Sequence, residues 1–133
     1  MQRNKYLDDL GIPIEEYSRK FSFDKRQFRW WKQRRDYGFD DRETWNLDYE
    51  FIEWLYSHCM MYKEKAGDVM NLEFHKVTWD DKEYTQIEII DFIIESTREY
   101  LKESAKWNLS NEIMKKVQCA VHLWAEVLPA MWW

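Results

Sequence analysis

Cations and aromatic rings are interleaved in the stretch KRQFRWWKQRRDYG, at residues 25–38 of an otherwise acidic chain. The stretch contains six Lys or Arg residues and four aromatic residues. Guanidinium groups bind phosphates and carboxylates through paired hydrogen bonds, and aromatic faces stack on bases or cations. Two interpretations follow. The stretch is either a surface that binds an anion such as a nucleotide, or a helix that buries its aromatic side in the core and exposes its basic side to solvent.

Two of the six cations, Arg34 and Arg35, decide between these interpretations. At about 100° per residue, a helix over residues 24–36 places its rings in one half and the other four cations in the opposite half. Arg34 and Arg35 project from the aromatic half, where a guanidinium needs a carboxylate, a phosphate or a ring face. In the first alternative they pair with acidic residues just downstream, namely Asp40, Asp41, Glu43 or Asp48.

In the second alternative the two arginines lie in a ligand pocket. A ring beside them would stack on a base while they hold a phosphate, and neighbouring cations would attract the anion. This alternative predicts a set of seven ligand contacts: Arg29, Trp31, Lys32, Arg34, Arg35, Tyr37 and Trp45. The pattern contains no catalytic signature, so we expect a binding protein rather than an enzyme.

Net charge limits the kind of ligand. The chain carries −5 overall, but residues 19–35 contain eight cations and one anion, a local charge of +7 that leaves −12 for the remainder. Long nucleic acids are bound by neutralising many phosphates, to which an acidic protein is poorly suited. One focused basic site suits a small anionic nucleotide better, so we expect no long nucleic acid as partner.

Two pairs of acidic residues offer a competing, catalytic interpretation. Glu50 and Glu53 are three residues apart, as are Glu88 and Asp91, so each pair lies on one helical face. The arrangement resembles the metal motif of the all-α nucleotide pyrophosphohydrolases, which implies Mg²⁺ held against the phosphates of a nucleotide. However, Glu88 is also placed to cap a helix, and the first pair fits a solvated face. The histidines show no zinc-ligand spacing with either cysteine, and we expect no cofactor.

The terminal sequence AMWW points to self-association. Trp132 and Trp133 follow Pro129, which ends a helix, so the two indoles either fold back onto the core or cross to another subunit. Tryptophan is enriched in protein interfaces and ligand pockets. We expect a homo-oligomer with Trp132 and Trp133 in its interface.

Apolar spacing and turn residues predict one mainly α domain over residues 1–133, with four to five helices in a compact bundle and a small β-hairpin. The expected helices cover residues 12–20, 24–36, 44–65 and 85–102 and a last segment between Ser110 and Pro129, with the hairpin at about 72–84. Gly38 is expected to close the second helix in a left-handed conformation. Thr85 and Glu88 form a capping box for the fourth.

The predicted third helix carries two apolar rows. One row is Leu47, Phe51, Trp54, His58 and Met61, and the other is Trp45, Tyr49, Ile52, Cys59 and Tyr62. A helix that is apolar over so wide an arc is expected to be central to the bundle. No run of the chain resembles a signal peptide or approaches the roughly 20 apolar residues of a membrane span, so we expect a cytoplasmic location and no membrane partner.

Three segments together resemble a group of short proteins encoded by bacteriophages and prophages. They are YGFDDRETWNLDYEFIEWL at residues 37–55, FHKVTWDDKEYTQIEIIDFI at residues 74–93 and LWAEVLPAMWW at residues 123–133. The resemblance implies a phage protein in the host cytoplasm that counteracts a host defence. The expected mechanism is sequestration of an anionic nucleotide signal. The alternatives are a protein inhibitor of a host defence enzyme and a Mg²⁺-dependent nucleotide pyrophosphohydrolase.

Overall fold

A computed structural model describes residues 4–12 and 25–132 of the 133-residue chain. The elements are α1 (Lys5–Asp9), α2 (Lys25–Tyr37), α3 (Arg42–Trp45), α4 (Leu47–Gly67), β1 (Lys76–Trp79), β2 (Lys82–Thr85), α5 (Gln86–Ala105), α6 (Asn111–Val127) and a 3-10 turn, η1 (Leu128–Ala130). The prediction of a mainly α fold with a small β-hairpin is confirmed. The opening helix predicted at residues 12–20 lies almost entirely outside the described residues.

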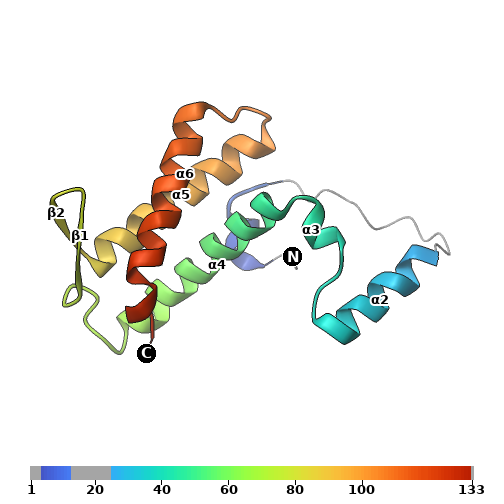
Figure 1. Ribbon diagram of the computed structural model, residues 1–133, viewed down its shortest axis with the longest axis horizontal. Helices are drawn as coiled ribbons and strands as arrows, with labels where there is room; N and C mark the ends of the chain where they lie inside the picture. The colour runs from blue at the N-terminus through green and yellow to red at the C-terminus, as the bar shows by residue number, and fades with distance from the viewer. Residues whose placement is uncertain (1–3, 13–24, 133) are drawn as a thin grey trace.

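Three long helices, α4, α5 and α6, form a bundle in which α5 contacts both of the others (Figure 1). Its interior is almost entirely aliphatic: Ile52, Leu55, Tyr56 and Cys59 from α4, Ile89, Ile90, Ile93, Ile94, Tyr100 and Leu101 from α5, and Ile113, Val117, Ala120, Leu123 and Val127 from α6. Burial of each such aliphatic side chain stabilises the fold by roughly 1.5–3 kcal/mol. The bundle is therefore the main core, and α1 and the hairpin pack against it.

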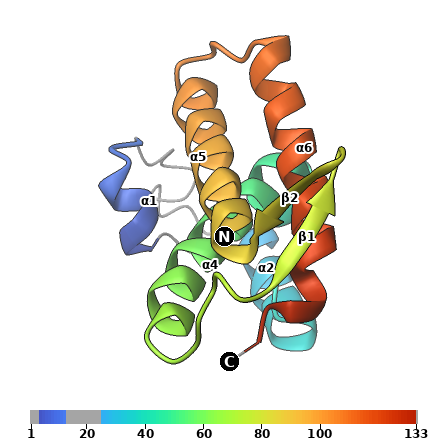
Figure 2. The same cartoon turned by 90° about the vertical axis from the view of Figure 1, so that its left-hand side faces the viewer.

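Local signals set the junction between the hairpin and α5. Asp80 and Asp81 have positive φ values of 50° and 60°, and they connect β1 to β2 as a two-residue turn whose twist suits a hairpin. Thr85 then caps α5. Its hydroxyl accepts a hydrogen bond from the Glu88 N–H, and the Glu88 carboxylate accepts one from the Thr85 N–H. The predicted capping box is confirmed. Figure 2 shows the hairpin beside the first turns of α5 and along α6.

A short helix that the sequence analysis did not predict, α1, packs against α4. The side chain of Asn4 accepts a hydrogen bond from the Leu7 N–H and thereby caps the helix. The Asn4 amide also donates to the Ser57 hydroxyl at 3.0 Å, and Leu7 is buried in the core. Five residues are too few for a recognisable apolar period, because helix identification relies on at least two to three turns.

The helix predicted at residues 44–65 is divided in two. Helical geometry breaks at Asn46, whose φ and ψ are −128° and 55°, between α3 and α4. Of the two predicted apolar rows, the row with Ile52 and Cys59 faces the core, except that Trp45 is 59 % exposed. The expectation of burial is wrong for the other row, since Leu47, Trp54, His58 and Met61 are exposed and Phe51 is half-buried. The physical reason is that α5 covers one side of α4, while α6 reaches the opposite row at one place, through Trp124.

The C-terminal segment folds back onto the bundle. The buried Gln86 amide donates to the Ala130 carbonyl at 3.3 Å and to the Tyr62 hydroxyl at 3.1 Å, and Met131 packs against the core. Trp132 nevertheless remains 71 % exposed, while Trp133 lies outside the described residues. Among the helices of the described ranges, none combines the length and the apolar character that crossing a membrane requires.

Candidate binding surface on the α2–α3 arm

The cation-rich stretch forms an arm, defined here as α2, the turn after it and α3 (residues 25–45). Figure 1 shows α2 to one side of the bundle, linked to α4 through α3. None of the thirteen residues of α2 is buried, and only Trp30 and Gln33 are half-buried. As predicted, Gly38 ends α2 with φ at 85°, and its N–H donates to the Arg34 carbonyl at 2.9 Å.

Trp30 is the side chain that joins α2 to α3. Its indole N–H donates to Asp41 Oδ1 at 2.8 Å, and its ring makes an edge contact with Trp45 at 6.5 Å between centroids. The guanidinium of Arg42 lies over the same ring, 4.2 Å from its centroid. The Gln33 side-chain oxygen accepts a hydrogen bond from the Asp41 N–H at 3.1 Å. These contacts hold one side of α2 against α3.

Asp40 is the electrostatic centre of the arm and is 1 % exposed. The Nε and Nη2 atoms of Arg42 donate to its two carboxylate oxygens at 2.9 and 2.8 Å, and Arg34 Nε lies 2.6 Å from Oδ2. The hydrogen bond from Arg42, together with the nearby charges of Arg42 and Arg34, lowers the pKa of Asp40 to about 2, despite the opposing effect of burial. Asp40 is therefore an ion-paired carboxylate that fixes α2 to the start of α3.

The structure pairs Arg34 and Arg35 with acidic residues of the chain itself. Arg34 bridges Asp40 at 2.6 Å and Glu43 at 2.7 Å, as in the first alternative. Arg35 pairs with Asp36 at 2.9 Å, a partner that the sequence analysis did not consider, and its guanidinium also lies 5.1 Å from the centroid of the Trp31 ring. The premise that both guanidinium groups are free for the phosphate of a ligand is wrong.

The rings of α2 do not enter a core either. Phe28 is 69 % exposed, Trp31 is 56 % exposed and Tyr37 is 73 % exposed, so the expected burial of the aromatic half is corrected by the structure. The physical reason is the position of the arm, which lies beside the bundle and presents only the Trp30 side of α2 to α3. Phe28 and Trp31 stack on each other at 5.8 Å between centroids.

An outer face of α2 results from this arrangement, made of Phe28, Trp31, Lys32 and Arg35. At about 100° per residue these four side chains lie within one arc of roughly 100°, opposite Trp30. Phe28 was not among the ligand contacts predicted from the sequence. The spacing of Phe28, Trp31 and Arg35 at i, i+3 and i+7 could have revealed it, because that spacing lies along one line of a helix.

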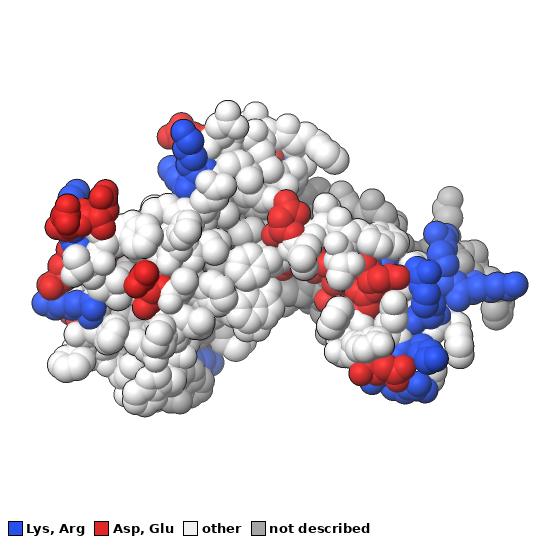
Figure 3. All heavy atoms as spheres, viewed as in Figure 1, with Lys and Arg blue, Asp and Glu red and all other residues white. Residues whose placement is uncertain are grey.

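The other predicted contacts are dispersed over the arm. Arg29 pairs with Asp41 at 2.9 Å, Trp45 lies on the inner side with Trp30, and Tyr37 makes a tilted ring contact with Phe39. The seven predicted contacts therefore do not converge on one hollow. In Figure 3 the blue spheres of Lys and Arg gather on the arm, whereas the front of the bundle is mostly uncharged.

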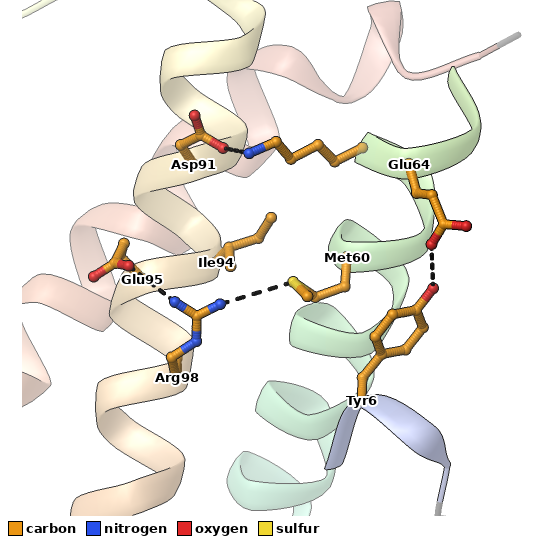
Figure 4. Close-up of a pocket in the computed structure, with 8 residues that line it drawn as sticks. Tyr6, Met60, Glu64, Asp91, Ile94, Glu95 and Arg98 are labelled. Carbon is orange, nitrogen blue, oxygen red and sulfur yellow. Dashed lines mark hydrogen bonds and ion pairs between the residues drawn. The ribbon is translucent and has the colours of Figure 1, made fainter. Parts of the chain in front are cut away.

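A groove that the structure does contain lies elsewhere, between α4 and α5, with α1 at one end (Figure 4). Its charged side chains are paired with one another: Lys63 with Asp91 at 2.6 Å, and Arg98 with Glu95 at 2.9 Å. The Tyr6 hydroxyl donates to Glu64 at 3.2 Å. A ligand in this groove would have to replace these internal contacts, and the groove contains none of the predicted ligand contacts.

The two acidic pairs of the metal hypothesis are not brought together. Lys63 meets Asp91 while Asp48 meets Tyr100, so α4 and α5 run in opposite directions. Glu50 and Glu53 therefore lie near one end of the α4–α5 contact, and Glu88 and Asp91 near the other. About ten residues of helix, roughly 15 Å, separate the two pairs. Over residues 4–12 and 25–132, no group of three or more Asp, Glu, His or Cys side chains is placed to hold a metal ion.

Comparison of the chain with protein-family models, with curated proteins and with solved structures found no match in any of the three.

Proposed function

We propose that this protein is a non-catalytic binding protein of a bacteriophage, and that it counteracts a host defence by attaching to a protein component of that defence through the outer face of α2. The observation that carries the proposal is this face, where Phe28 and Trp31 are stacked and exposed beside Lys32 and Arg35. The resemblance of three segments to short phage proteins supports the host-defence part of the proposal.

The outer face has the composition of a protein-binding helix. Aromatic residues and Arg are enriched in interfaces and provide most of the binding energy in many of them. An amphipathic helix that docks in a groove presents anchors at i, i+3 or i+4, and i+7. Phe28, Trp31 and Arg35 follow this spacing on a helix that is held from its other side. The arm therefore offers its partner a preformed helix, which reduces the ordering cost of binding.

A protein partner fits the arm better than a nucleotide does. Small-molecule sites are concave, whereas the outer face is the convex surface of a single helix. A phosphate on Arg34 would have to displace Glu43 and Asp40, and Asp40 is buried. Asp40 would retain Arg42, but both ion pairs that join Arg34 to the residues after α2 would be lost. A protein groove supplies the concavity itself, and we expect an apolar groove with Asp or Glu at its rim to receive Lys32 and Arg35.

The test compares two matched substitutions in a purified complex. The tagged chain is used to isolate its partner from the infected host, and the two purified proteins are then titrated by calorimetry. Phe28→Ala is expected to weaken binding by about 30-fold, because an interface anchor contributes about 2 kcal/mol or more. Phe74→Ala removes a ring that is also exposed, at 83 %, on a different part of the molecule, and it should leave the affinity unchanged.

Equal affinities of the two variants would reject the proposed face. Nucleotide sequestration remains a second candidate, supported by the exposed Trp31–Arg35 stack, which has the chemistry of a base and phosphate contact. Thermal unfolding in the presence of cyclic and linear nucleotides, with and without Mg²⁺, separates the candidates. A nucleotide-dependent rise in Tm that is lost in Arg35→Gln would favour sequestration over a protein partner.

A further inference from the structure

A second surface, which the described residues leave largely uncovered, runs along the outside of α4. Its members are Leu47, Phe51, Trp54, His58 and Met61, here called the outer seam, and they follow one another at intervals of four, three, four and three residues. This average of 3.5 residues is the spacing by which one helix packs along another in a coiled coil. Trp54 is 40 % exposed and Met61 is 52 % exposed, so the seam is open along most of its length.

The rings of the outer seam are already held in place. Trp54 lies against Trp124 of α6 in an edge contact at 6.1 Å, and Phe51 meets the same indole at 5.6 Å. His58 stacks on Trp54 at 4.3 Å, and its Nδ1 atom lies 2.7 Å from the Trp54 carbonyl oxygen. Because these side chains are fixed before any partner binds, little rotamer entropy remains to be lost on association.

Charge on α4 is distributed unevenly along the helix. The first half contains Asp48, Glu50 and Glu53 and no cation, whereas the second half contains Lys63, Glu64 and Lys65. Lys65 lies in line with the seam and pairs with the exposed Glu64 at 3.2 Å. A parallel pair of such helices would place carboxylates beside carboxylates. An antiparallel pair places the acidic half of each helix beside the end that carries Lys65, and it also opposes the two helix dipoles.

We propose that two copies of this chain form an antiparallel dimer through the outer seam of α4. A two-fold axis between Ser57 and His58 places Trp54 opposite Met61 of the partner subunit, since both positions are the same distance from the axis. The same register places Glu50 opposite Lys65 of the partner subunit. Apolar and charged contacts therefore agree on one register, and a thioether against an indole is a favourable contact in itself.

This dimer would carry the two arms at opposite ends, because α3 precedes the N-terminus of each α4. The outer seam and the outer face of α2 lie on different helices, so the inference does not depend on the proposed function. Trp132, which is exposed beyond η1, is a further candidate for the interface, and Trp132→Ala measures its contribution.

Sedimentation equilibrium of the full chain at tens of micromolar tests the interface. The unaltered chain is expected to be a dimer, and Met61→Glu is expected to be a monomer with unchanged far-UV circular dichroism. Val69→Glu introduces the same charge at a site that is 65 % exposed and outside the seam, and it should remain a dimer. A monomeric unaltered chain, or a dimeric Met61→Glu variant, would overturn the proposal. Trp31→Ala should remain a dimer; a monomer would assign self-association to α2 instead.

A charge exchange tests the antiparallel register. Lys65→Glu and Glu50→Lys each place like charges opposite one another, so each variant alone should already dissociate at a higher concentration than the unaltered chain does. Mixed in equal amounts, the two variants should form a heterodimer in which both charge pairs are restored. Failure of the mixture to associate better than either variant would exclude the proposed register.

Discussion

Removal of the Asp40 carboxylate should release α2 from α3 and leave the bundle intact. The pKa of Asp40 falls from an ordinary 3.8 to about 2 in the folded arm. At about 1.36 kcal/mol for each tenfold change in proton affinity, this corresponds to roughly 2 kcal/mol of stabilisation from the ionised carboxylate. In Asp40→Asn the two guanidinium groups lose their shared anion, and Arg34 retains Glu43 alone among the partners seen here. Most of this stabilisation comes from Arg42 of α3 and the smallest part from Arg34 of α2, so it is lost only when α2 and α3 unfold together. The free energy for unfolding the arm as a whole should therefore fall by about 2 kcal/mol.

Amide hydrogen exchange measures this opening residue by residue. A loss of about 2 kcal/mol increases the exchange rate by about 30-fold, and this increase is expected for the amides of α2 in Asp40→Asn. Amides of α5 should exchange at the unaltered rate because α5 makes its contacts inside the bundle. Asp36→Asn is the matched control, since Asp36 pairs only with Arg35 among the described ion pairs and is partly exposed; exposed pairs contribute little.

The pH dependence gives the same prediction independently. Because the folded pKa of Asp40 lies below the unfolded value, its contribution is complete above about pH 4 and is lost as the pH falls toward 2. Exchange of α2, corrected for its intrinsic pH dependence, should accelerate over this interval in the unaltered chain and not in Asp40→Asn. If Asp40→Asn and Asp36→Asn changed α2 equally, or if α5 accelerated as much as α2, the assignment of Asp40 as the anchor of the arm would be refuted.

Three further substitutions test the bundle and its ends by urea and thermal unfolding. Ile90→Ala empties a site with no exposure in the second turn of α5 and should reduce the free energy of unfolding by about 2–5 kcal/mol; a loss below about 1 kcal/mol would contradict the assigned core. Thr85→Ala removes the hydroxyl that caps α5 and should cost about 1 kcal/mol, whereas Thr85→Ser should cost less because it keeps the acceptor. Trp107 follows the C-terminus of α5 with φ at 57°, a conformation that costs a non-glycine residue about 1–2 kcal/mol. Trp107→Gly should therefore raise Tm by a few degrees, and a fall in Tm would show that this indole makes a stabilising contact.

The ends of several elements follow from the sequence because their causes are local. Thr85 and Glu88 cap α5, and Gly38 ends α2 in the left-handed region. Each of these features depends on residues within one helical turn, so a short segment of sequence contains the necessary information. The same holds for the two-residue turn of the hairpin.

Which apolar surfaces are covered was decided only by the tertiary structure. The sequence gives α4 two apolar rows of similar strength, and nothing local distinguishes the row that meets α5 from the row that faces outward. For the same reason the rings of α2 suggested a buried face, although the arm lies beside the bundle. Burial depends on where distant helices lie, and helical periodicity within one segment contains no information about that position.

Arg34 shows both what the sequence determined and what it left open. The sequence identified Asp40 and Glu43 as possible partners and left a ligand phosphate as the alternative, since an arginine among rings is compatible with either. The turn at residues 38–41 then brings Asp40 within 2.6 Å of Arg34 and buries it beneath Arg42. The sequence determined that the guanidinium group of Arg34 needed a carboxylate, a phosphate or a ring face, because its charge cannot be removed at ordinary pH. Only the tertiary structure determined that the chain itself supplies the anions, which leaves the exposed rings of α2 as the surface available to a partner.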